Sequence, residues 1–174
     1  MTITVKSFHQ AIIDTIKDHF SGKVQVISYP LETSEIRTPA VLLEMESAEE
    51  GQDPGDGRLA LRCRMAVHCV LGFQTDDIGM EVRSFSTQLF VLLADNKFGL
   101  GSEVSWPEGL ELHPGEFKPG KAGFESWCVI WEQTIYLGES EWDDNGVVPE
   151  IVMLGIAPDI GIGHDPDYED ITNA

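Results

Sequence analysis

The densest group of side chains that could do chemistry lies near the C-terminus, in the segment His164-Asp165-Pro166-Asp167-Tyr168-Glu169-Asp170. Carboxylate oxygens with one imidazole are a donor set that suits a divalent cation. The segment lacks the Asp-x-Asp-x-Asp-Gly frame and the spaced bidentate Glu of a calcium loop, and Pro166 restricts its backbone. We therefore expect a solvated or partner-docking acidic segment and no metal ion.

Cysteine and histidine side chains do not converge in the sequence. Cys63 and Cys69 are six residues apart on one face of a predicted strand, which separates them by about 20 Å, too far for a shared metal. Cys128 is the third cysteine, and an odd number in apolar alternation predicts buried free thiols rather than a disulfide framework. The five histidines are scattered, with no His-Glu-x-x-His, Cys-x-x-Cys or nucleophile-elbow pattern. The chain is expected to be non-enzymatic and to need no cofactor.

Three arginines, Arg58, Arg62 and Arg64, occupy alternate positions along one predicted strand in a chain that is short of cations. Such a face can be ordinary solvent-exposed surface, paired with acids of the same chain. It can also be a subunit interface, where guanidinium groups meet carboxylates of a neighbour. Both interpretations stay open from the sequence.

A second charged feature is a stretch of acids from residue 44 to residue 56, which contains no base. Glycine and proline predict an irregular loop from Ser47 to Gly57. The loop is either solvated or, in a ring, it lines a negative channel or faces a partner. The acids of the whole stretch, two of which precede the loop, are Glu44, Glu46, Glu49, Glu50, Asp53 and Asp56.

The clearest element that would position these charges is a strand over residues 59–71. Its odd positions are Leu, Leu, Cys, Met, Val, Cys and Leu, whereas Arg, Ala, Arg, Arg, Ala and His occupy the even positions from 58 to 68. Period two over this length predicts one buried face and one wet, basic face.

The remaining elements follow from apolar spacing. Apolar residues at three- and four-residue intervals predict two amphipathic helices. Asp76 and Asp77 are placed to cap the second helix. Helices are expected at 4–20 and 76–95, and strands at 23–29, 40–46, 108–118 (weak) and 124–137. Because helices and strands do not alternate regularly, we expect an α+β fold, with an antiparallel or mixed sheet carrying two helices on one face.

The chain changes character after residue 138. Residues 139–174 hold ten acids and no Lys or Arg, together with an apolar cluster between residues 147 and 162. A solvating tail would not carry that cluster, and the Gly and Pro within it disfavour a long helix. We expect a domain over 1–138 and an extended acidic arm over 139–174 that packs on its own domain or on a neighbour. Candidate docking residues are Ile151, Leu154, Ile160, Asp165, Asp167 and Tyr168.

The overall charge excludes some partners. There are 30 acidic and 11 basic residues, a formal net charge of −19, so the chain is a poor candidate for binding nucleic acid by phosphate neutralisation. The N-terminus has no secretory signal pattern, and no apolar run is long enough to span a membrane. We expect synthesis in a reducing cytoplasm and no membrane partner.

The element order resembles that of tail terminator proteins of tailed phages. The residues that carry the resemblance are Thr38-Pro39-Ala40-Val41-Leu42-Leu43-Glu44 and Trp127-Cys128-Val129-Ile130-Trp131-Glu132-Gln133, within residues 1–138. The chain is similar to the lambda minor tail protein U type and, more closely, to the Mu-like terminator or completion family. The resemblance implies a virion protein that forms a ring, hexameric in that family, at the head-proximal end of the tail tube.

The same resemblance implies contacts with the tube protein and with a neck or head–tail connector protein, while DNA passes through without specific binding. The long acidic arm departs from the family pattern. Two alternatives remain: another head–tail adaptor or baseplate component, and a monomeric acidic module that mimics nucleic acid.

Overall fold

A computed structural model describes residues 2–28, 36–115, 123–142 and 150–171. The chain divides into two compact units, Met1–Glu141 and Trp142–Ala174. The predicted boundary between residues 138 and 139 lies three residues before this division. Each unit is described by itself below.

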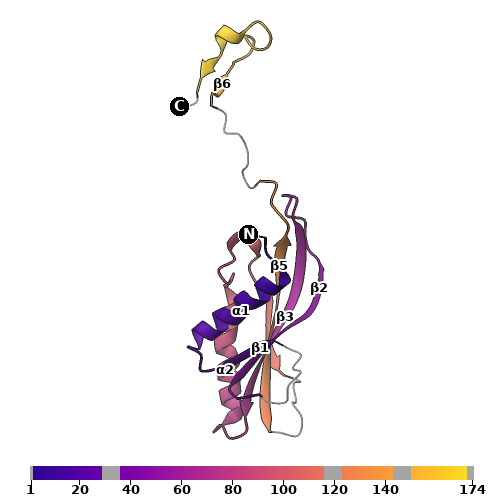
Figure 1. Cartoon of the computed structure of the whole chain (residues 1–174), viewed down its shortest axis with the longest axis vertical. Helices are drawn as coiled ribbons and strands as arrows, with labels where there is room; N and C mark the ends of the chain where they lie inside the picture. The colour runs from indigo at the N-terminus through magenta and orange to yellow at the C-terminus, as the bar shows by residue number, and fades with distance from the viewer. Residues whose placement is uncertain (1, 29–35, 116–122, 143–149, 172–174) are drawn as a thin grey trace. The chain divides into compact units, whose positions relative to one another are not determined.

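The first unit is an α+β domain (Figure 1), as predicted. Its helices are α1 (Val5–His19) and α2 (Ile78–Ala94), and its strands are β1 (Gln25–Ser28), β2 (Ala40–Glu50), β3 (Leu59–Gly72), β4 (Glu108–Pro114) and β5 (Phe124–Leu137). A short 3-10 helix, η1 (Gly101–Glu103), precedes β4. The predicted strand residue Tyr29 and the predicted strand end at 116–118 lie outside the described residues.

The five strands form one mixed sheet in the order β1-β2-β3-β5-β4. β1 runs parallel to β2, and every other neighbouring pair is antiparallel. The strands β3 and β5 pair along their full lengths, from Leu59 opposite Leu137 to Gly72 opposite Phe124. This central pair provides the frame on which the remaining strands are registered.

Both helices pack on one face of the sheet. The main core joins Phe8, Ile12 and Ile16 of α1, Val82 and Leu89 of α2, and the odd-numbered side chains of β3. The strand contributions to this core from β3 are Cys63, Met65, Val67, Cys69 and Leu71. The period-two prediction for β3 is therefore confirmed for its buried face.

The opposite face of β3 is only partly wet, contrary to the prediction. Ala60, Ala66 and Val70 are buried there. Ala66 lies between Glu44 on β2 and Ile130 on β5. A methyl side chain between longer neighbours is shielded from water even without a helix above it, so alternation alone overestimates the exposed area.

The helix ends differ in their chemistry. Thr4 precedes α1 and forms a capping box with Ser7, since the Ser7 amide donates to the Thr4 hydroxyl and the Thr4 amide donates to the Ser7 hydroxyl. Asp77 precedes α2 as predicted, but its side chain makes no capping bond because its backbone is left-handed (φ 46°). The predicted position is right and the predicted capping interaction is wrong.

Candidate interaction surfaces

The face of the sheet opposite the two helices, the helix-free face, carries a network of ion pairs between strands. Arg62 bonds Glu132 and lies 4.0 Å from a Glu49 carboxylate oxygen. Arg64 donates to Glu46 (2.9 Å) and approaches Glu132 (3.8 Å). The two arginine side chains remain 46% and 40% exposed, so they are paired within the chain and still accessible.

A bulge in β2 makes this pairing possible. The register between β2 and β3 shifts between Met45 and Ser47, so that Glu46 and Ser47 both meet the region opposite Arg64. Beyond the bulge, Glu49 lies opposite Arg62. The predicted loop from Ser47 is therefore wrong at its start, because β2 continues to Glu50. A run of acids is a poor strand former on its own, and the arginines across the register compensate for it.

Arg58 does not belong to this exposed face, contrary to the prediction. It precedes β3, its side chain is 11% exposed, and its guanidinium bonds Asp56 (2.7 Å). It also lies 3.7 Å from Glu103 and stacks over the Tyr136 ring at 5.1 Å. Hydrogen bonds and charge from Arg58 lower the pKa of Asp56. This pair ties the β2–β3 connection to η1 and β5.

The six predicted lumen or partner-facing acids thus fall into different environments. Asp56 is buried in its pair with Arg58, and Glu44 faces His68, with 3.1 Å between Oε2 and Nε2. Asp53 accepts a hydrogen bond from the Gly55 amide, which shapes the turn. Glu50 is an exposed residue at the end of β2. The structure does not gather these acids into one surface.

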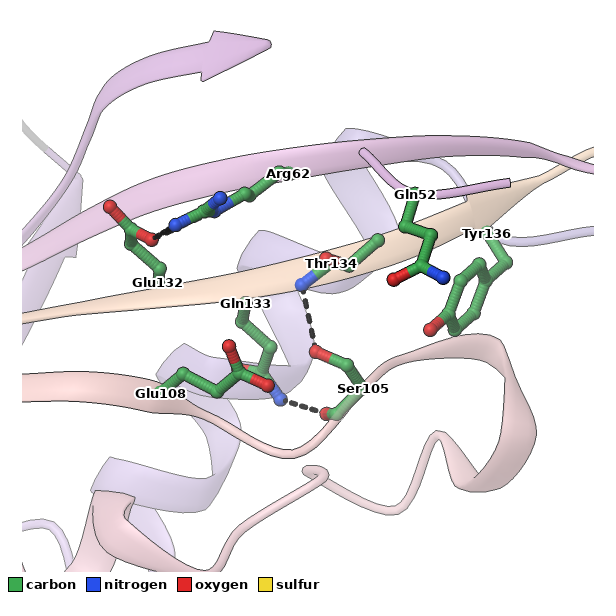
Figure 2. Close-up of a pocket in the computed structure, with 8 residues that line it drawn as sticks. All are labelled: Gln52, Arg62, Ser105, Glu108, Glu132, Gln133, Thr134 and Tyr136. Carbon is green, nitrogen blue, oxygen red and sulfur yellow. Dashed lines mark hydrogen bonds and ion pairs between the residues drawn. The ribbon is translucent and has the colours of Figure 1, made fainter. Parts of the chain in front are cut away.

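A small polar pocket of about 200 Å³ lies beside the arginine network. Figure 2 shows Arg62 and Glu132 on one side and Ser105 on the other, where Thr134 donates its amide to the Ser105 hydroxyl. That hydroxyl in turn donates to the carbonyl of Trp106. Glu108 lies opposite Glu132 in the strand register, so two carboxylates face one guanidinium. The serine is held by the backbone on both sides, which is a structural arrangement rather than that of an activated nucleophile.

All three cysteines are buried free thiols, as predicted. Burial raises the pKa of Cys63 to about 11 and that of Cys128 to about 12. Within the described ranges, no three His, Cys, Asp or Glu side chains are grouped closely enough to hold a metal ion. No helix in the described part of the chain is long and apolar enough to cross a membrane.

The second unit has a short hairpin in place of a purely extended arm. β6 (Met153–Leu154) pairs antiparallel with β7 (Glu169–Asp170), and the Ile171 amide donates to the Val152 carbonyl (Figure 1, yellow). The loop between the strands contains a 3-10 helix, η2 (Asp165–Asp167), where Asp167 pairs with His164 at 3.0 Å. Residues 147–149 of the predicted apolar cluster lie outside the described residues.

Tyr168 closes this loop. Its hydroxyl accepts a hydrogen bond from the Gly161 amide, and its ring packs so closely on Gly155 that an added Cβ there would lie 2.7 Å from it. Tyr168 therefore acts within its own unit. By contrast, seven large apolar side chains between residues 151 and 162 are exposed, from 42% for Val152 to 107% for Ile162. The exposed set is Ile151, Val152, Met153, Leu154, Ile156, Ile160 and Ile162.

Sequence reasoning missed Glu132, which binds both exposed arginines from the paired strand. Its position in the alternation of β5 identifies its face, but only the β3–β5 register places it beside Arg62 and Arg64.

Comparison with known protein families found no family model that matches the chain. Comparison with curated proteins likewise found no significant match.

Proposed function

We propose that this protein is a non-enzymatic structural subunit of a phage virion, a tail terminator that forms a ring at the head-proximal end of the tail tube. The observation that supports the proposal best is the domain of residues 1–141. Its helix–strand order and its mixed sheet with both helices on one face agree with what the resemblance implies.

The charge distribution is compatible with DNA passing through such a ring. A net charge of −19 repels phosphate and leaves no counterion-release attraction to hold a duplex in place. Four of the six acids between residues 44 and 56 are engaged by Arg58, Arg62, Arg64 or His68. Glu50 and Asp53 make no ion pair with another described residue, and they are the carboxylates of this stretch that remain to face a lumen or partner.

The same pairing disfavours the alternative of a nucleic-acid mimic. A mimic must present carboxylates that a basic partner can bind, but on the helix-free face Glu46, Glu49 and Glu132 are already paired with two arginines of the same chain. An adaptor or baseplate role in the virion remains the nearest competing function.

The proposal is tested in phage particles that lack the protein. Loss of a terminator is expected to produce headless tails of uncontrolled length in electron micrographs, because nothing caps the growing tube. Tails of normal length on intact heads would contradict a terminator role. Normal tails that fail to join heads would indicate an adaptor instead.

A further inference from the structure

The two edges of the sheet are unequally protected. β4 forms one edge and carries Glu108, Glu111, Pro114 and a register shift, all features that discourage another strand from pairing. β1 forms the other edge with the uncharged sequence Gln-Val-Ile-Ser. Among the described strands only β2 pairs with β1, so the other side of β1 is a free edge within that part of the chain.

The register shows which backbone groups face this edge. The Gln25 amide donates to the Pro39 carbonyl, so in a parallel pair the backbone groups of Val26 and Ser28 face away from β2. Beside them lies a groove of about 660 Å³ between the end of α1 and β1, lined by Lys17, Val24 and Val26 among others. The free edge thus has an adjoining space for side chains of an added strand.

Most of the described cations that lack an ion-pair or aromatic partner lie near this end of the domain. Arg58, Arg62 and Arg64 are in ion pairs, and Arg83 and Lys97 stack on Trp127 and Trp106. Four other cations have no such partner among the described residues. They are Lys6, Lys17, Lys23 and Arg37.

Three of these four surround β1. Lys17 lines the groove, Lys23 precedes β1, and the Arg37 amide donates to the Gln25 side chain at 2.7 Å. Asp18 balances Lys17 within the lining of the groove, and Lys23, directly before Val24 of that lining, adds a further positive charge beside it. The groove therefore suits an extended segment that is apolar in its strand and acidic around it.

The C-terminal unit contains a segment of this kind. Residues 151–156 read Ile-Val-Met-Leu-Gly-Ile, with every aliphatic side chain substantially exposed. β6 within it pairs on one side only, with β7, in the described residues. From residue 142 onward the chain has eight acids and no Lys or Arg.

Covalent reach favours a second copy over the same chain as the acceptor. Across the paired strands, Val26 on β1 is level with Trp127 on β5, which is three strands away in the sheet. Trp127 itself lies about 33 Å along β5 from Leu137. The Glu141 amide donates a hydrogen bond to the Asp56 carbonyl, at the end of the sheet where β5 ends. From there to Ile151 the chain spans at most about 35 Å, so it would have to be fully stretched to reach its own β1.

We propose that residues 151–156 of one copy add as a strand along the free edge of β1 in a second copy. The aliphatic side chains enter the α1–β1 groove, and the surrounding acids face Lys17, Lys23 and Arg37. Because the donor and acceptor surfaces differ, the contact is heterologous and can be repeated from subunit to subunit until a ring closes. The inference rests on the self-assembly part of the proposed function and does not require the tail role.

The test uses full-length protein and its mass in solution by analytical ultracentrifugation over a range of concentrations. An arm variant, Met153→Asp with Leu154→Asp, and a groove variant, Lys17→Glu with Lys23→Glu, are each expected to sediment as monomers where the native chain associates. Matched controls are Val91→Asp, an exposed valine on α2, and Lys6→Glu, an unpaired lysine at the other end of α1. Both controls are expected to associate like the native chain.

A mixture of the two variants separates neighbour docking from docking within a chain. The arm variant keeps an intact groove and the groove variant keeps an intact arm, so an equimolar mixture is expected to form one-to-one dimers and nothing larger. A native chain that stays monomeric at high concentration would overturn the proposal, as would association that both variants retain. A mixture that stays monomeric would also overturn it.

These outcomes are distinct from those of the tail experiment. If both variants lose association and particles lacking the protein have normal tails, the docking contact is supported and the terminator role is rejected. If the tails are uncapped and both variants still associate, the terminator role is supported and the docking contact is rejected.

Discussion

The two units of this chain use apolar side chains in opposite ways. In residues 1–141, aliphatic and aromatic side chains from both helices and one sheet face are buried together, and many are fully inaccessible. In residues 142–174, most aliphatic side chains of the described part are exposed, on a hairpin with two residues in each strand and on the loop between those strands. Burial drives folding in the first unit, whereas exposure in the second is suited to association.

The largest expected difference between the units is in amide hydrogen exchange. Amides in the centre of β3 are expected to exchange at least about 1,000-fold more slowly than those of β6 and β7, because they open only with the whole domain. Exchange measured by mass spectrometry on dilute protein checks this. Equal protection in the two units would show that the C-terminal unit is as stable as the domain.

A matched pair of leucine substitutions compares the units directly. Leu89→Ala on α2 removes a fully buried side chain and is expected to cost about 2–5 kcal/mol of unfolding free energy. Leu154→Ala is expected to change it by less than about 0.5 kcal/mol, since that side chain is already 45% exposed. Urea denaturation of both variants measures the difference, and a similar loss in the two would contradict it.

Arginine substitutions separate the structural cations from the surface cations. Arg58→Met leaves Asp56 without its guanidinium partner inside the domain, so the urea midpoint is expected to fall. Arg64→Met breaks a pair that is about 40% exposed, and such pairs contribute only about 0.2–1 kcal/mol. A larger shift for Arg64→Met than for Arg58→Met would show that the exposed network, not the Arg58 cluster, stabilises the domain.

The smallest expected effect is a dependence of domain stability on pH. Burial lowers the pKa of His9 on α1 below its ordinary value of about 6.5. The unfolded chain then binds more protons than the folded domain below about pH 6.5, so the free energy of unfolding falls as the pH drops through this range. His9→Gln is expected to flatten this slope in urea titrations between pH 7 and pH 5. An unchanged slope would show that groups other than His9 cause the pH dependence.

Asp56 acts in a lower pH range. Because Arg58 lowers its pKa in the folded domain, its stabilising contribution is present above the unfolded value of about 3.8 and is lost as the pH falls below that value. The two groups therefore predict two separate pH windows of destabilisation.

Local pattern was sufficient for the elements and their buried faces. The alternation of residues 59–71 and the stripes of the two helices identified the core side chains, and β5 begins and ends where its pattern predicts. Period two and period 3.6 are properties of the backbone itself, so they are visible without knowing which strands pair. The burial of Cys63 and Cys69 followed from the same local pattern, whereas Cys128 is buried on the other face of the sheet, in a cluster with Ala66 and Ile130.

Pairing between distant strands decided the rest. The parallel β1–β2 pair, the bulge that extends β2, and the meeting of Arg62 and Arg64 with Glu132 all depend on register. The alternation of a strand excludes a one-residue slip, but which strand it pairs with and where a bulge falls depend on residues far apart in the chain. For that reason the acids and arginines were visible in the sequence, while their partition into a buried pair at Arg58 and an exposed network at Arg62 and Arg64 belongs to the tertiary structure.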